Sequence, residues 1–195
     1  GKNSNEIVLE LVKNLSNLKG GDFVVSVDEH SVVLVKDVGE TDRLKLESRL
    51  RETADSLVDN ILTEVMIKVR VGYSNLNDAL IKIADSFQEA KLALEVGRVF
   101  YAEKEVISYE KLGIGRLIYQ LPMSLCEMFI REVFGENVPE ILDDEEAMST
   151  IAKFFENNLN ISETARQLYV HRNTLVYRLE RIEKAIGLDI RTFDD

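Results

Sequence analysis

The spacing of apolar residues predicts a helix and a hairpin within the first 35 positions. Apolar side chains recur about every four residues over 6–15, which is typical of one face of a short helix. Two β-branched runs follow at 23–27 and 31–35, with only polar residues at 28–30 between them. This pattern predicts a β-hairpin. Because apolar residues hardly alternate with polar ones in either run, we expect both faces of both strands to be buried.

Helical and strand periodicities alternate over the next 75 residues. A long charged helix is predicted from Thr41 to about Leu62, with leucine and isoleucine facing inward. Residues 65–71 alternate apolar and basic positions, which predicts a strand with one open face. Asn77 or Asp78 is expected to cap a second amphipathic helix. The run 105–109 is long enough for a last short strand.

Beyond Lys111 the strand patterns stop, and only helices are predicted. A short apolar helix is expected over 112–120, and Pro122 suits the first turn of the next one. The core face expected for that second helix consists of Leu125, Phe129, Ile130 and Val133. Asp143 or Asp144 is placed to cap a further helix.

These elements predict an α/β fold followed by an all-α domain. Residues 136–139 form the best linker candidate, because they end on a proline and follow a glycine. The expected division is an α/β domain over 1–110, a helical connector over 111–141 and a small helical domain over 142–195.

The segment 160–187 carries the clearest functional pattern. Asn160 with Glu163 three residues later is the arrangement of a capping box and opens a helix of about two turns. Val170 is an apolar residue in a three-residue turn, and His171 is placed to cap a longer helix. A short helix, a tight turn and a longer helix form a helix-turn-helix, whose second helix enters the major groove of DNA.

The longer helix has a buried stripe and an opposite polar face. The buried stripe is formed by Leu175, Leu179, Ile182 and Ile186. The side chains expected to face the groove are Asn173, Thr174, Tyr177 and Arg181. Asn173 suits adenine, Thr174 suits a thymine methyl group, and Arg181 suits guanine or phosphate. Arg172 and Arg178 flank this face and are expected at backbone phosphates.

Other interpretations of these residues stay open. His171 is a helix cap or a phosphate contact in preference to a metal ligand. Arg178 has an alternative role as the partner of protein carboxylates, and Tyr177 has one in packing against the preceding helix. The whole segment 160–187 also has a purely structural interpretation as a helical hairpin.

The charge distribution restricts the kind of nucleic-acid binding that is expected. A formal net charge of −11 argues against a sequence-blind, charge-driven binder. Residues 147–195 hold seven basic and seven acidic residues, so the whole net charge belongs to 1–146. A neutral module binds DNA weakly alone, which favours a homodimer on a two-fold symmetric site of double-stranded DNA.

Composition argues against several other classes of protein. One cysteine, Cys126, and two histidines, His30 and His171, leave too few ligands for a zinc site and no internal disulfide. We expect Cys126 to be a small core residue, and we expect no metal and no cofactor. The lone cysteine makes a reducing cytoplasm the expected location. No apolar run is long enough for a membrane span.

Specific residues resemble a known family. The run Ala165-Arg-Gln-Leu-Tyr-Val-His-Arg-Asn-Thr-Leu175, continued by Tyr177-Arg-Leu179, resembles the C-terminal helix-turn-helix of the PucR/CdaR family of bacterial transcription regulators. Upstream, Val71-Gly-Tyr73 and Ser86-Phe-Gln-Glu-Ala90 resemble the GGDEF-like domain that precedes it in that family. The resemblance implies a degenerate cyclase-like α/β sandwich and a sequence-specific DNA-binding regulator.

The sequence departs from catalytic GGDEF domains, so we expect no enzyme activity. Their signature occupies a hairpin turn, but the turn here, 28–31, has no glycine. Gly20-Gly-Asp22 resembles the signature in its residues but not in its position, because it precedes the first strand. The alternatives are a nucleotide cyclase or hydrolase, and a module that binds a nucleotide or small effector without catalysis. The family usually carries an N-terminal sensor domain, which the chain is expected to lack, so its effector stays unknown.

Overall fold

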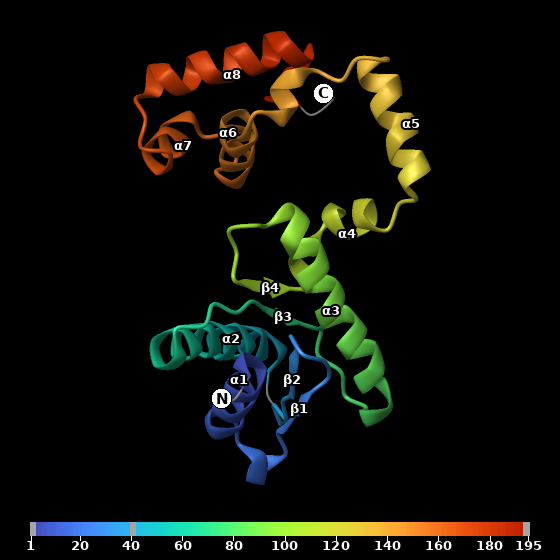
Figure 1. Ribbon diagram of the computed structural model, residues 1–195, viewed down its shortest axis with the longest axis vertical. Coiled ribbons are helices and arrows are strands. Elements are labelled where there is room, and N and C mark those ends of the chain that lie inside the picture. The colour runs from blue at the N-terminus through green and yellow to red at the C-terminus, as the bar shows by residue number, and fades with distance from the viewer. Residues whose placement is uncertain (1–2, 40–41, 193–195) are drawn as a thin grey trace. The chain divides into compact units, whose positions relative to one another are not determined.

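The computed structural model describes residues 3–39 and 42–192 (Figure 1). The chain divides after Gln120 into two compact units, 1–120 and 121–195. This boundary lies inside the stretch 111–141, for which the sequence predicts a helical connector. Thr41, the predicted start of the long helix, lies outside the described residues.

The first unit contains four α-helices and four short strands in its described part. The helices are α1 (Ser4–Leu15), α2 (Arg43–Val65), α3 (Ile83–Phe100) and α4 (Ile114–Tyr119). The strands are β1 (Phe23–Ser26), β2 (Val32–Val35), β3 (Val71–Tyr73) and β4 (Val106–Ser108). The antiparallel hairpin predicted from the sequence is confirmed, with Phe23 opposite Val35. β3 and β4 form a separate parallel pair, in which Val71 lies opposite Val106.

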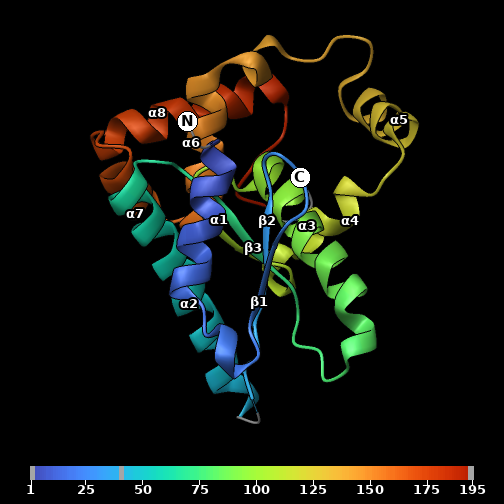
Figure 2. The same cartoon turned by 60° about the horizontal axis from the view of Figure 1, so that its bottom comes forward.

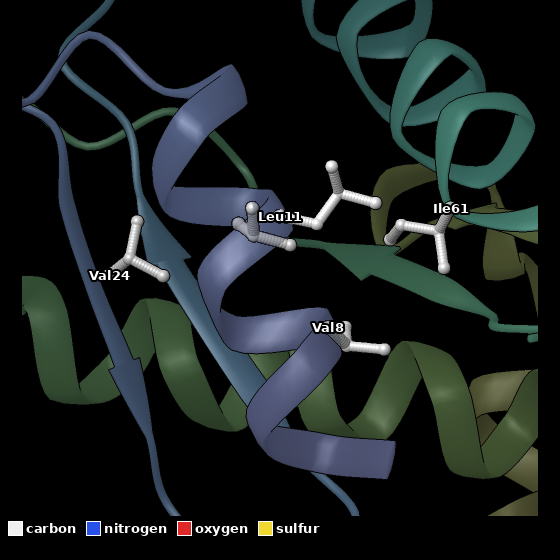
Figure 3. Packing of buried hydrophobic residues seen from close by; sticks show 5 residues of the cluster. Val8, Leu11, Val24 and Ile61 are labelled. Carbon is white, nitrogen blue, oxygen red and sulfur yellow. The ribbon is translucent and has the colours of Figure 1, made fainter. Parts of the chain in front are cut away.

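Helices lie on both sides of the strands of the first unit. α1 and α2 lie on one side and α3 on the other (Figure 2). The main core cluster brings Val8 and Leu11 of α1 against Val24 of β1 and Ile61 of α2 (Figure 3). A second cluster forms where α3 meets β4, around Val96 and other side chains.

The hairpin is not buried on both faces, and that prediction is wrong. Of the residues of β1, only Val24 is buried, whereas Phe23 is 62% exposed. The residues of β2 are all half-buried. α1 packs on the side of β1 that carries Val24, so side chains that point the other way remain exposed.

The strand predicted over 65–71 is also wrong in its position. α2 continues to Val65, Met66 follows with a positive φ of 57°, and β3 begins only at Val71. The alternation therefore belongs to the segment 66–70, which has no regular secondary structure. Gly72 explains how β3 approaches α3, because a Cβ there would lie 2.5 Å from the carbonyl oxygen of Ala90.

The cap predicted for the helix after β3 is a further correction. α3 begins at Ile83, after the 3₁₀ turn Leu80–Lys82, so neither Asn77 nor Asp78 is its N-cap. Asn77 instead donates a side-chain hydrogen bond to the hydroxyl of Ser86. The polar residue that the sequence offers as a cap thus ties the preceding loop to the first turn of the helix.

The second unit consists of helices only in its described part. They are α5 (Met123–Phe134), α6 (Glu145–Glu156), α7 (Ile161–Gln167) and α8 (Arg172–Ile186). Asp144 caps α6 as predicted, accepting hydrogen bonds from the backbone N–H groups of Glu146 and Ala147.

The core face predicted for α5 is wrong. None of the twelve residues of α5, all of which the structure describes, is buried. Cys126 is half-buried rather than a core residue. The helix itself is correctly predicted, but its apolar side chains are not part of the core cluster of the second unit.

Within 3–39 and 42–192, no helix combines the length and the apolar character that a membrane span requires.

One carboxylate in the first unit is buried, and both of its oxygens accept hydrogen bonds from other protein groups. Asp22, the last residue of Gly20-Gly-Asp22, accepts hydrogen bonds from the backbone N–H groups of Asn17 (2.9 Å) and Asp37 (3.0 Å) and pairs with Lys36 (3.0 Å). Burial raises the pKa of Asp22, but these hydrogen bonds and the charge of Lys36 outweigh it and leave the pKa below 3.8.

We expect Asp22→Asn to lower the free energy of unfolding by about 1–3 kcal/mol at neutral pH, because buried hydrogen bonds to a charge are lost. A lowered folded-state pKa stabilises the fold above the unfolded-state value, and this stability is lost as pH falls through the folded-state value. The wild type should therefore lose more stability than Asp22→Asn on acidification from about pH 5 to about pH 3. Thermal unfolding at several pH values measures this. An equal acid loss in both proteins contradicts it, and exposed Asp59→Asn is the control.

Candidate nucleic-acid interface

α6, α7 and α8 share one core. Phe154 of α6, Ala165 of α7, and Leu175 and Leu179 of α8 form a buried cluster, with Leu168 and Val170 partly buried against it. Ile182 is buried as well, and Ile186 is half-buried. The predicted inward stripe of the longer helix is therefore confirmed. Ala165 lets α7 and α8 cross closely because its side chain is a single methyl group.

Two buried threonines were missed by the sequence analysis. Thr164 and Thr150 are almost fully buried, and each hydroxyl donates to the carbonyl four residues earlier, on Asn160 and Glu146 respectively, at 2.8 Å. This bonding satisfies the hydroxyl within its own helix, so threonine is tolerated at a core position. The signal in the sequence is their spacing, since Thr150 lies four residues before Phe154 and Thr164 lies four residues before Leu168.

The start of α7 shows half of the predicted capping box. The side-chain oxygen of Asn160 accepts the backbone N–H of Glu163 at 3.1 Å. The carboxylate of Glu163 does not return to Asn160 but binds the side chains of Arg166 and Gln167. These hydrogen bonds, that of Arg166 first, lower the pKa of Glu163 to about 2. Arg166 is therefore held on the surface of α7.

Residues of the turn between α7 and α8 fix its conformation. Tyr169 has a φ of 55° and is almost fully exposed, while Val170 is half-buried. His171 is the N-cap of α8, as predicted, because its Nδ1 accepts the backbone N–H of Asn173 at 3.2 Å. The turn thus places the first residues of α8 at the surface. The exposure of Tyr169 is a feature that the sequence pattern did not single out.

The N-terminal half of α8 presents an exposed polar face. The side chains that lie there are His171, Arg172, Asn173, Thr174 and Tyr177, all of them exposed. Tyr177 is 66% exposed, which argues against its alternative role in packing on α7. No acidic residue occurs over 171–179. This part of α8 therefore combines hydrogen-bonding groups with a local positive charge.

The two other predicted arginines are engaged by α6. Arg178 lies 2.7 Å from a carboxylate oxygen of Glu146 and is only 24% exposed. Arg181 lies 2.9 Å from a carboxylate oxygen of Asp144. The pKa of Asp144 is lowered by the backbone N–H groups of Glu146 and Ala147 first, and by Arg181 in addition. The sequence analysis foresaw a carboxylate partner for Arg178 but not for Arg181.

The described residues contain no group of three or more histidine, cysteine, aspartate or glutamate side chains arranged to hold a metal ion.

Comparison with known families matches two separate parts of the chain. A profile of the PucR C-terminal helix-turn-helix domain matches residues 147–195, and a profile of a GGDEF-like domain matches residues 2–96. The chain is thus a helix-turn-helix protein in which this domain follows a GGDEF-like domain.

Several curated regulators are similar to this chain over most of its length. The purine catabolism regulatory protein of Bacillus subtilis (strain 168) is 29% identical over 148 residues, covering 74% of this chain and 28% of the relative. The carbohydrate diacid regulator of Escherichia coli (strain K12) is 28% identical, covering 88% and 44%. The proline-responsive transcriptional activator PutR of B. subtilis is 21% identical, covering 96% and 46%. The chain therefore carries a PucR-type helix-turn-helix domain and a GGDEF-like domain, and it is similar to these regulators over most of its own length. It spans less than half the length of each of them.

The His171 cap gives a test of how the exposed face is positioned. His171→Ala removes the acceptor for the N–H of Asn173, and we expect a loss of about 1 kcal/mol in the stability of the first turn of α8. Amide hydrogen exchange should show weaker protection of Asn173. His171→Asp restores an oxygen acceptor and should keep the protection. Equal protection in His171→Ala and the wild type would contradict the capping role.

Proposed function

We propose that this chain provides the DNA-binding part of a transcription regulator, with α8 as the helix that enters the major groove. The observation that carries the proposal is the exposed, acid-free face over 171–177 at the start of a helix whose opposite face is buried. Such an arrangement leaves the polar side chains free for bases and phosphates. The three relatives support it, since each is named as a regulator or an activator.

Each exposed side chain has a role in this proposal. Asn173 donates and accepts at the edge of adenine, and Thr174 contacts a thymine methyl group. Arg172 and His171 lie at the N-terminus of α8, where free backbone N–H groups and the helix dipole favour phosphate. Tyr177 extends the face by one turn and donates its hydroxyl to a phosphate or a base edge.

Arg178 and Arg181 have a second role in the proposal. Their ion pairs with Glu146 and Asp144 hold α8 against the start of α6. A carboxylate already beside an arginine weakens the attraction of that arginine for phosphate. We therefore assign direct DNA contact first to Arg172, Asn173, Thr174 and Tyr177, with His171 at the edge. Arg178 and Arg181 contribute mainly by orienting the helix.

The α/β unit is proposed to be a non-catalytic module. Both carboxylate oxygens of Asp22 are used by Asn17, Asp37 and Lys36, so the Gly20-Gly-Asp22 stretch offers no free carboxylate for a metal-bound nucleotide.

The regulator is further proposed to act as a homodimer on double-stranded DNA, in the cytoplasm. Its effector is not assigned; a small molecule bound by the α/β unit is the second candidate function, open to thermal-shift screening.

The first test concerns base recognition. DNA fragments bound by the longest available native chain are selected from a genomic library, and their affinities are measured. Asn173→Ala should cost about 1–3 kcal/mol at a selected site and relax the preference for one base pair. Asn14→Ala, on the exposed side of α1, is the matched control and should change nothing. Unchanged affinity and unchanged preference in Asn173→Ala would remove α8 from the role of reader.

The second test separates free from engaged arginines. Among the described residues Arg172 has no ion pair, whereas Arg181 has one. Arg172→Ala should weaken binding to all sequences alike and reduce the slope of log affinity against log salt by about 1 for each helix bound. Arg181→Ala should change the slope less. Equal slope changes in the two variants would show that DNA displaces Asp144 from Arg181.

A further inference from the structure

α5 carries an apolar face that no described element of the second unit covers. The helix has twelve residues, and none is buried. Phe129 is 64% exposed, and Leu125, Ile130 and Val133 are each about 40% exposed. An exposed patch of this kind marks a site of interaction more often than a solvated surface. The spacing of its apolar residues and the charges beside them indicate which molecule binds this face.

The apolar positions of α5 form one continuous half of the helix. At about 100° per residue, the side chains that share this half are Met123, Leu125, Cys126, Phe129, Ile130, Val133 and Phe134. Cys126 and Val133 are seven residues apart and lie near the middle of the face. Phe129 and Ile130 lie between these two residues along the helix axis. This is the spacing of a helix that packs against another helix along its length.

The charged flank of this face is complementary to itself. Glu127 and Arg131 lie on the same edge of the apolar half, four residues apart. In an antiparallel pair of identical helices, each edge meets the same edge of its copy. An antiparallel pair centred between Phe129 and Ile130 brings Cys126 opposite Val133 of the copy. The same alignment places Glu127 close to Arg131 of the copy, within one residue of direct opposition.

The charge of the surroundings favours a second copy over other occupants. The chain as a whole carries −11, so most surfaces of two copies repel each other. Residues 113–134 hold two arginines and two glutamates and are neutral. A membrane surface needs a polar face rich in lysine and arginine, whereas that of α5 carries Glu127, Arg131 and Glu132.

We propose that α5 is the self-association surface of this protein, through antiparallel packing of its apolar half against α5 of a second copy. This inference deepens the homodimer of the proposed function by naming the helix that forms it. Because α5 ends eleven residues before α6 begins, pairing of α5 joins two helix-turn-helix domains in one assembly related by a two-fold axis.

The test measures mass without DNA, so it fails or succeeds independently of DNA binding. The 22.2-kDa chain should sediment as a dimer of twice that mass at about 50 μM. Phe129→Glu places an unpaired charge in the interface and should raise the dimer dissociation constant by about 30-fold or more. The matched control is Ile81→Glu, the same type of change at a fully exposed residue in the first unit, which should leave the mass unchanged.

A charge exchange keeps the proposal falsifiable if Phe129→Glu fails to fold. Glu127→Arg alone should weaken the dimer, and Glu127→Arg with Arg131→Glu should restore it, with circular dichroism unchanged in both. A monomeric wild type overturns the proposal, as does a dimer that Phe129→Glu and Glu127→Arg leave intact. A monomeric wild type whose thermal unfolding is lowered by Phe129→Glu shows that α5 packs within its own chain.

Discussion

The packing of α8 onto α7 and α6 is the constraint on which the candidate site depends. Leu175 and Leu179 are buried against Ala165 and Phe154, so the rotation of α8 about its own axis is fixed. Once that rotation is fixed, Asn173 and Tyr177 have to point away from the protein, because they lie on the opposite side of the same helix. The exposed face is thus a consequence of the buried one.

The ion pairs to α6 divide the polar surface of α8 into two parts. Asp144 and Glu146 stand at the N-terminus of α6, where a negative charge is also favoured by the helix dipole. Each of them therefore serves α6 and α8 together, Asp144 as a cap and as the partner of Arg181, Glu146 as the partner of Arg178. Among the described residues, Arg172 in the first turn of α8 has no carboxylate partner. A protein with an acidic body thus keeps an unpaired cationic side chain at the start of the helix that is proposed to enter the groove.

The sequence predicts local features of this chain well and long-range ones poorly. The capping roles of Asn160, Asp144 and His171 depend on residues within three positions, and all three are found. The hairpin is also found, because its turn and its β-branched runs adjoin each other. The burial of its two faces was misjudged, because burial depends on which helices cover each face. The pairing of Arg181 with Asp144 joins residues 37 positions apart, and no local pattern signals it.

The same distinction explains α5. Periodicity identifies an amphipathic helix but does not say whether its apolar half packs within the chain or against another molecule, since both require the same pattern. In α8 the stripe is buried by α6 and α7, and the polar half is left for another molecule. In α5 the apolar half itself is exposed, next to a self-complementary pair of charges. The two helices therefore present opposite surfaces: α8 offers hydrogen-bonding groups suited to a polyanion, and α5 offers apolar area suited to its own copy.

A neutral DNA-binding domain gains affinity when two copies bind together, because the second contact becomes intramolecular. The zero net charge of residues 147–195 makes binding by a single copy weak, and the exposed apolar face of α5 provides a surface through which two copies can bind together.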